Sequence, residues 1–179
     1  MGGRFNEKLL EINISERTIS IIFELHLSWN KLISDNMINK DSFINVAPCG
    51  MNCSLCLANQ RTKNTCAGCN ALAGIKVNHC STCSIRNCEE LPETGFCYSC
   101  KKFPCKRIKH LDKRYWTNYG MSMISNLQMI ETTGIDEFNK REKEKWTCSK
   151  CGSLLCVHRP VCLKCGNKND RFPEHAHLN

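Results

Sequence analysis

The chain has 179 residues, enough for one domain or two small ones. Its hydrophobic fraction of 41% includes 16 cysteines, and three Trp, three Tyr and seven Phe form a modest aromatic supply. A unit so rich in cysteine and so poor in large side chains needs disulfides or metal ions to fold, which excludes a fold held by hydrophobic packing alone.

The sequence predicts a cytoplasmic protein whose cysteines bind metal. Its first residues lack the basic and apolar regions of a secretion signal, and no apolar run approaches the length of a membrane span. In a cytoplasmic chain, clustered cysteines indicate metal ligands rather than disulfides. The candidate ligands are Cys49, Cys53, Cys56, Cys66, Cys69, Cys80, Cys83, Cys88, Cys97, Cys100, Cys105, Cys148, Cys151, Cys156, Cys162 and Cys165.

The formal net charge of +8 suggests a nucleic-acid partner, but it counts every cysteine as neutral. A zinc ion held by four thiolates carries a net charge of about −2. Three such sites would lower +8 to about +2, and four would bring it to about zero. We therefore expect a protein partner, no membrane partner, and nucleic acid only as the weaker alternative.

Residues 1–46 contain no cysteine and predict an N-terminal helical extension. Apolar residues recur at mostly helical spacing from Ile19 to Ile38, and Ser15 is a suitable N-cap. We interpret this stripe as a packing surface for the metal-binding part, with a docking helix for another protein as the alternative.

Residues 47–110 form a cysteine-rich module that predicts several metal sites. The segments "HCSTCSIRNC" and "FCYSCKKFPC" share the pattern C-x2-C-x4-C, which returns in "TCSKCGSLLC" further along the chain. If each site uses two neighbouring C-x2-C pairs, the sequence predicts three zinc sites of four thiolates each. Four cysteines remain and would allow a fourth site, for three to four zinc ions per chain: Cys49, Cys88, Cys105 and Cys156. His79, His110 and His158 stay open as alternative ligands.

An iron–sulfur cluster is the main alternative for the cysteines of residues 49–105. Cys49, Cys53 and Cys56 have the C-x3-C-x2-C spacing of radical SAM enzymes, but Leu55 stands where those enzymes have an aromatic residue. The chain is also too short beyond this point for their barrel. A [4Fe–4S] cluster held by four cysteines at irregular spacing fits this module better.

Residues 111–147 predict a helical connector. Met121, Ile124, Leu127 and Ile130 follow near-helical spacing up to Gly134, which is a suitable helix end. A short, highly charged helix is expected to follow, up to Trp146. The basic run of residues 100–110 has Phe103 as its only aromatic residue, which is too little for stacking on bases, so we interpret it as structural.

Residues 148–179 predict a zinc-ribbon-like unit followed by a polar tail. Its spacing is C-x2-C-x10-C-x2-C, with Gly152 and Gly166 after the second cysteine of each pair. We expect Cys148, Cys151, Cys162 and Cys165 to hold zinc. In the loop between them, Cys156 and His158 are expected to support the ligands or to replace one of them.

The motifs "APCGMNCSLC", "CAGC", "CSIRNC", "CYSCKKFPCKRI" and "WTCSKCGSLLCVHRPVCLKCG" resemble a family of uncharacterised cysteine-rich metal-binding proteins that is common in anaerobic archaea and bacteria. The resemblance covers about residues 47–167 and leaves the N-terminal segment outside. It implies a small metal-binding protein of anaerobic cytoplasm, and it brings no known reaction.

The expected fold is a small, irregular, metal-stabilised α+β structure, with a cysteine-rich zinc-knuckle module, a zinc-ribbon-like unit and flanking helices. We see no Ser/His/Asp set, carboxylate pair or phosphate-binding glycine loop. A zinc ion closed by four thiolates also has no position left for a reactive water. The sequence therefore favours a non-catalytic protein that docks a partner.

Overall fold

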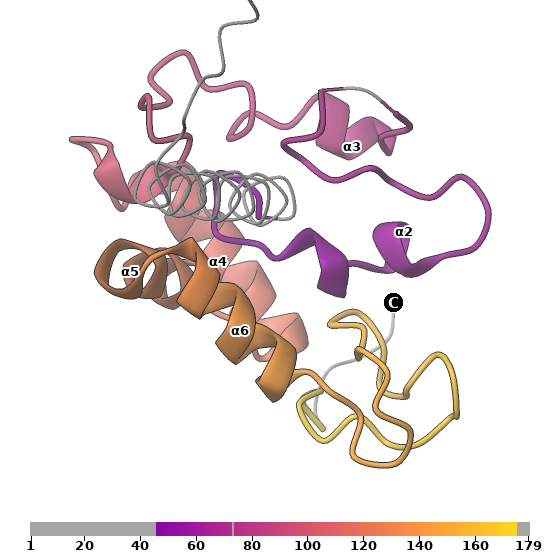
Figure 1. The fold of residues 1–179 in the computed structure, drawn as a ribbon. Coiled ribbons are helices and arrows are strands. Elements are labelled where there is room, and N and C mark those ends of the chain that lie inside the picture. The colour runs from indigo at the N-terminus through magenta and orange to yellow at the C-terminus, as the bar shows by residue number, and fades with distance from the viewer. Residues whose placement is uncertain (1–45, 73, 175–179) are drawn as a thin grey trace, which may run out of the picture. The chain divides into compact units, whose positions relative to one another are not determined.

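The computed structural model describes residues 46–72 and 74–174 (Figure 1). The N-terminal extension predicted for residues 1–46 lies outside these residues except for Val46, as do His175 and His177 of the tail. The described ranges contain only helices, turns and irregular segments, in this order: η1 (Cys53–Leu55), α2 (Leu57–Gln60), α3 (Asn78–Ser81), η2 (Cys97–Ser99), α4 (Lys106–Tyr119), α5 (Met123–Thr133) and α6 (Ile135–Lys145).

The β part of the expected α+β fold is reduced to three isolated bridges within the described ranges. These bridges pair Val46 with Asn52, Thr147 with Leu154, and Val161 with Lys168. The cysteine-rich segments turn back every few residues, so no stretch there is long enough to build a ladder of backbone hydrogen bonds. The described part of the chain is therefore small and helix-rich.

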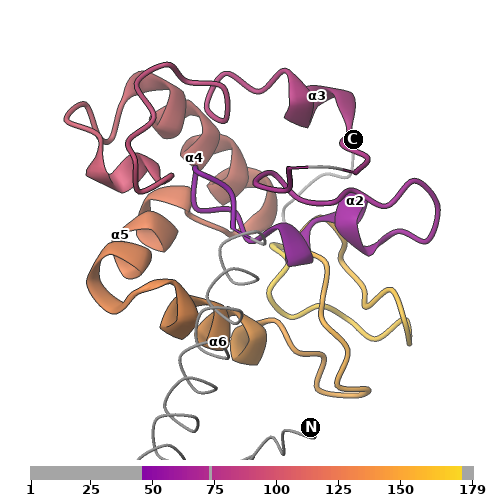
Figure 2. The same cartoon turned by 45° about the horizontal axis from the view of Figure 1, so that its top comes forward.

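Three consecutive helices, α4, α5 and α6, form the regular part of the fold, with α5 in contact with both of the others (Figures 1 and 2). The helix expected to end at Gly134 and the charged helix expected after it are confirmed as α5 and α6. The sequence reasoning missed the start of α4, which begins directly after Cys105, inside the basic run, and crosses the boundary expected at residue 110.

Backbone groups at the helix ends form hydrogen bonds with nearby residues. The backbone N–H of Gly120, at φ 64°, donates to the Trp116 carbonyl and ends α4. Asp112 of α4 accepts from the Ser122 hydroxyl (2.7 Å) and the Ile124 backbone N–H (3.0 Å). This carboxylate therefore joins the middle of α4 to the start of α5.

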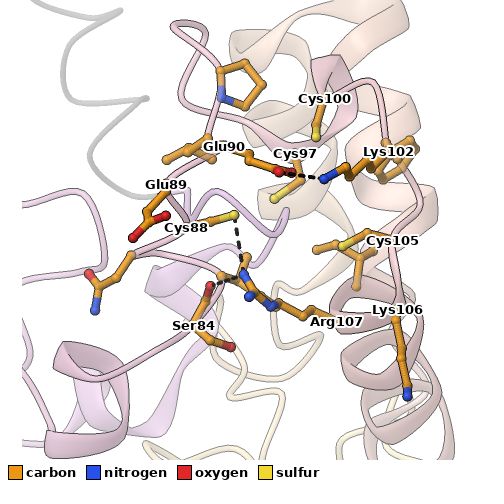
Figure 3. Close-up of a pocket in the computed structure, with 16 residues that line it drawn as sticks. Ser84, Cys88, Glu89, Glu90, Cys97, Cys100, Lys102, Cys105, Lys106 and Arg107 are labelled. Atoms are coloured by element: carbon orange, nitrogen blue, oxygen red, sulfur yellow. Dashed lines mark hydrogen bonds and ion pairs between the residues drawn. The ribbon is translucent and has the colours of Figure 1, made fainter.

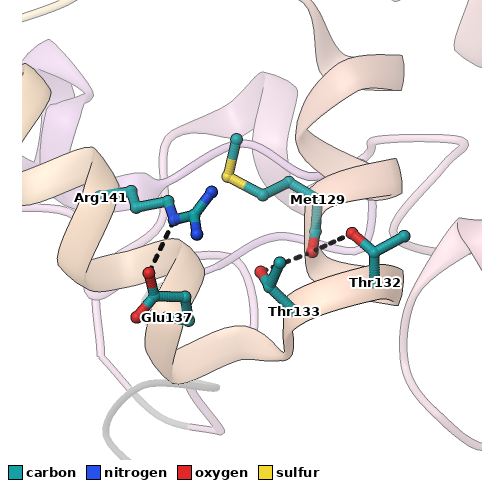
Figure 4. A network of polar contacts seen from close by, with 5 residues as sticks. All are labelled: Met129, Thr132, Thr133, Glu137 and Arg141. Carbon is teal, nitrogen blue, oxygen red and sulfur yellow. Dashed lines mark hydrogen bonds and ion pairs between the residues drawn. The ribbon is translucent and has the colours of Figure 1, made fainter.

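Polar contacts within each helix lie on either side of the corner between α5 and α6 (Figure 4). The hydroxyls of Thr132 and Thr133 donate to the Met129 carbonyl at 3.2 and 2.9 Å. On α6, Arg141 pairs with Glu137 one turn earlier, at 2.7 Å. Such an exposed pair adds little to stability, because water and salt screen it.

Two hydrophobic clusters join the cysteine-bearing loops to the helices. The first combines Leu55 with Met121 and Met123 near α5 and with Trp146 and Val157 beside the C-terminal cysteines. The second is formed by Val46, Ile85, Phe96, Ile108, Leu127, Ile130 and Phe138. The helices therefore provide the apolar surface on which loops with few hydrogen bonds of their own are placed.

The turn that carries Cys49 packs directly on α5. Gly50 has φ 83°, and a Cβ added there would lie 2.9 Å from Leu127 Cγ and 3.0 Å from the Met123 carbonyl oxygen. The buried Asn126 amide donates to the Gly50 carbonyl at 3.0 Å. Only a residue without a side chain allows this close approach.

Helix α6 carries a buried carboxyl group. Glu142 is 3% exposed, and its Oε2, like Trp146 Nε1, has no hydrogen-bond partner among the residues that the structure describes. Burial raises the pKa of Glu142, and the Lys145 ammonium, 4.0 Å from Oε1, opposes the shift. The charged form of this group therefore works against folding.

We expect Gly50→Ala to lower the free energy of unfolding by about 2–4 kcal/mol, because it adds both an unfavourable positive φ and a clash with α5. Gly120→Ala is the matched control, since φ is also positive there but the nearest atom is 3.3 Å away, on the Pro173 ring. Urea unfolding monitored by circular dichroism measures both. Equal losses in the two variants would contradict the packing argument.

We expect Glu142→Gln to stabilise the fold at pH 7 by about 1–3 kcal/mol, because it removes a buried charge. A carboxyl group with a raised pKa costs nothing below its unfolded pKa of about 4.5 and destabilises increasingly as the pH rises through its folded pKa. The gain should therefore shrink as the pH falls toward 4.5. The exposed Glu144→Gln is the control for unfolding curves at both pH values, and a pH-independent gain would refute the charge argument.

Candidate metal centres

The C-terminal cysteines lie on two loops of the same construction. In the first loop the Gly152 N–H donates to the Cys148 carbonyl at 2.9 Å, and in the second the Gly166 N–H donates to the Cys162 carbonyl at 2.9 Å. Both glycines have positive φ, and an isolated bridge closes each loop at its base. The second loop thus repeats the first after 162 − 148 = 14 residues.

These two loops bring four sulfur atoms to one point. Cys148 Sγ lies 3.7 Å from Cys165 Sγ, and Cys151 Sγ lies 3.7 Å from Cys162 Sγ. All four lie within 4.8 Å of one another, and no other such group of three or more ligand atoms occurs in the described part of the chain. Sulfurs bound about 2.3 Å from one tetrahedral zinc ion stand about 3.8 Å apart.

Hydrogen bonds to sulfur favour the thiolate form of two of these cysteines, whereas burial and the other thiols of the group, outweighing a hydrogen bond from the Asn167 backbone, raise the pKa of Cys165 to about 11. Hydrogen bonds from Ser153 lower the pKa of Cys151 to about 6. The backbone N–H groups of Cys165 and Lys164 lower the pKa of Cys162. Thiolates are the form that binds metal, so the loops prepare the ligands electrostatically as well as geometrically.

Cys156 and His158 lie outside this group of four. Cys156 is fully buried, and burial raises the pKa of its thiol. His158 Nδ1 accepts from the Leu57 backbone N–H at 3.3 Å, and Nε2 lies 3.3 Å from the Tyr115 hydroxyl. Burial lowers the pKa of His158 to about 4, so the ring is neutral near pH 7. Both of its nitrogens have protein partners, which leaves neither for a metal.

The other two candidate histidine ligands lie apart from the groups of ligand atoms in the described ranges. His79 and His110 are exposed, and within the described ranges they do not belong to a cluster of ligand atoms. The role of His158 was missed in the sequence because its partners, Leu57 and Tyr115, are remote from it along the chain. It holds the C-terminal loop against α2 and α4.

A second group of thiols lies in the first half of the cysteine-rich module. The Cys69 backbone N–H donates to Cys53 Sγ at 3.4 Å. Burial, followed by repulsion from Cys69, Cys66 and Cys56, raises the pKa of Cys80 to about 12. These five cysteines are near neighbours, although their sulfurs do not converge as tightly as those of the C-terminal group.

A third group surrounds a cavity of about 480 Å³ beside the start of α4 (Figure 3). Its four cysteines are Cys88, Cys97, Cys100 and Cys105. Burial, followed by repulsion from Cys105, Cys88 and Cys100, raises the pKa of Cys97 to about 12. The Arg107 guanidinium donates to Cys88 Sγ at 3.4 Å and to the Ser84 carbonyl at 3.1 Å.

Cys53, Cys56, Cys66 and Cys69 lie in one group, as the pairing of neighbouring C-x2-C motifs predicts, but Cys80 and Cys83 lie near different groups. Cys80 faces the second group, whereas Cys83 adds to the repulsion felt by Cys97 in the third. Cys49 lies between them, since Cys69, Cys83 and Cys97 all contribute to raising its pKa to about 12 after burial. Cys88 and Cys105, left over by the pairing, line the same cavity as the Cys97/Cys100 pair.

These features define a cysteine-rich protein with a four-thiol group able to hold a metal ion. Residues 45–110 match the family described as "Protein of unknown function (DUF3795)", which confirms the expected resemblance to an uncharacterised family over the cysteine-rich module. The match ends at residue 110, so the C-terminal loops lie beyond it, contrary to the expected extent to about residue 167. No curated protein and no solved structure matches the chain.

None of the helices in the described ranges is long and apolar enough to cross a membrane.

We expect His158→Ala to lower the free energy of unfolding by about 2–3 kcal/mol, because it leaves the Leu57 N–H without its acceptor and removes a ring that packs 4.7 Å from Tyr119. His110→Ala, on the exposed side of α4, is the control and should change stability by less than about 0.5 kcal/mol. Metal content measured on both variants should stay at the wild-type level. A loss of metal in His158→Ala but not in His110→Ala would indicate that His158 binds the metal.

Proposed function

We propose that this is a non-catalytic zinc-binding protein, with a structural zinc ion held by Cys148, Cys151, Cys162 and Cys165 in a zinc-ribbon-like unit. The observation that carries the proposal is the pair of 3.7 Å sulfur–sulfur distances, which match the edge of a tetrahedral four-thiolate zinc site.

The surroundings of these four cysteines support a structural rather than a reactive ion. Cys148 and Cys162 are 2% and 1% exposed, and Cys148 packs in the same hydrophobic cluster as Trp146, Leu155 and Val157. Four thiolates fill the coordination of zinc and leave no position for water or substrate. The ion would therefore contribute to folding and would supply no Lewis acid to a substrate.

The proposal includes a protein partner in the cytoplasm. Val161 and Leu163, on the second C-terminal loop, are 42% and 47% exposed. A metal-held loop presents such apolar side chains at little cost in conformational entropy, which favours protein contacts.

Nucleic acid is the second candidate partner, and the surface of α4 is the observation that favours it. Lys106, Arg107, Lys109, Lys113 and Arg114 are all exposed on this helix. Trp116, near its end, is 63% exposed and could stack on a base. An affinity for oligonucleotides that falls steeply with salt would support this candidate, and a salt-independent affinity would argue against it.

We expect the purified full chain to carry zinc at this site, and Cys151→Ser and Cys165→Ser each to lose about one zinc ion per chain. Both cysteines are only partly buried, so serine is tolerated sterically. Elemental analysis measures the loss, and cobalt substitution should give the absorption bands of a tetrahedral thiolate site.

Cys156→Ala is the matched control, because it removes a thiol from the same loop region without touching the group of four. It should keep the zinc. Retention of all zinc by Cys151→Ser and Cys165→Ser would refute the site, as would a cobalt spectrum that lacks thiolate charge-transfer bands.

A further inference from the structure

The cavity beside the start of α4 differs from the C-terminal centre in a way that bears on its ligand. The four C-terminal sulfurs close on a single point, whereas no three of Cys88, Cys97, Cys100 and Cys105 have their sulfurs within 4.8 Å of one another in the described structure. These four cysteines instead stand around a shared space of about 480 Å³ (Figure 3). A single water-sized sphere needs only about 10–15 Å³.

We propose that this cavity is the binding site of an iron–sulfur cluster held by Cys88, Cys97, Cys100 and Cys105. In a [4Fe–4S] cluster each cysteine binds a different iron, and the iron and sulfide atoms separate the thiolates. Four cysteines spread around a hollow therefore suit a cluster, while four sulfurs in mutual contact suit one ion.

The local chain supports this assignment. Cys97 and Cys100 lie at the start and the end of the short helix η2, and Cys105 is the residue before α4. Cys88 comes from the preceding loop and faces them across the cavity (Figure 3). Three separate segments thus bring their cysteines to one cavity. Iron–sulfur clusters accept ligands at such irregular spacings along the chain.

The charges around the cavity fit an anionic group. Four thiolates leave a [4Fe–4S] cluster with a net negative charge, and the charged side chains that line the cavity are three cations, Lys102, Lys106 and Arg107, and two anions, Glu89 and Glu90. Lys102 is paired with Glu90 at 2.5 Å, so Arg107 is the cation in direct contact with a sulfur, at 3.4 Å. Ile85 and Ile108, both buried, cover the inner side and limit the access of water to the cluster.

Anaerobic reconstitution of the full chain with ferrous iron and sulfide tests the site. We expect about four iron and four sulfide per chain, with a visible charge-transfer absorption. Cys97→Ser and Cys105→Ser should reduce both contents to near zero. Cys56→Ser, an equally half-buried cysteine of the second group, and Cys151→Ser of the zinc site should retain them.

The possible results separate this site from the proposed zinc site. The proposal is overturned if the wild type takes up no iron and sulfide, if Cys97→Ser and Cys105→Ser retain them, or if these variants lose a zinc ion instead. Zinc at Cys148–Cys165 is measured in the same samples, and its retention by Cys97→Ser, Cys105→Ser and Cys56→Ser shows that these variants have folded.

A second measurement decides the question if the cysteine variants do not fold. The hydrogen bond from Arg107 to Cys88 Sγ stabilises the more negative, reduced form of a cluster. Arg107→Gln should therefore lower the reduction potential with the iron content unchanged. Lys106→Gln removes the same charge from the cavity wall without a sulfur contact and should shift the potential less. Equal potentials in Arg107→Gln and the wild type would overturn the assignment.

Discussion

The burial of many cysteines close to one another is the constraint on which the rest of this structure depends. Burial, together with the other cysteines around them, raises the pKa of Cys49, Cys80 and Cys97 to about 12 each. Such groups cannot ionise together at neutral pH unless a cation balances them. A cation bound among these cysteines would therefore be coupled to the folding of the segments that carry them.

Packing on the three long helices stabilises loops that have few backbone hydrogen bonds of their own. Isolated bridges are the only β pairing in the described ranges, so the loops gain little from backbone ladders. They gain instead from packing on α4, α5 and α6, as at Gly50, where the backbone comes close to Leu127. The Leu55 carbonyl accepts from the Val157 N–H at 3.0 Å and ties the first cysteine loop to the C-terminal one. A metal centre on such a platform is placed by hydrophobic burial as much as by its own ligands.

The thiol groups fall into two kinds with different chemical capacity. The C-terminal group has sulfurs in contact and backbone N–H donors aimed at them, which is the environment of a closed ion site. The group around the cavity is spread out and has one guanidinium against one sulfur. The first kind has the geometry to hold a single ion, and the second lines a cavity with room for a larger group.

The sequence by itself determined the features that depend on local spacing. The C-x2-C-x10-C-x2-C pattern with its two glycines singled out the four cysteines that come together, because a tight turn and a short loop leave few other arrangements. The spacing of Ile124, Leu127 and Ile130 likewise predicted α5, since a helix packs residues that recur at its own period against the core. These are properties of neighbours along the chain.

Only the tertiary structure decided which remote groups meet. Cys80 and Cys83 form one motif in the sequence but lie near different thiol groups, because the chain passes from one group to the next at that point. Cys88 gains its place from a cavity that exists only when its loop packs against α4. His158 is held by Leu57 and Tyr115, partners 101 and 43 residues away. Contacts at such separations follow from how whole segments pack, which short-range spacing does not encode.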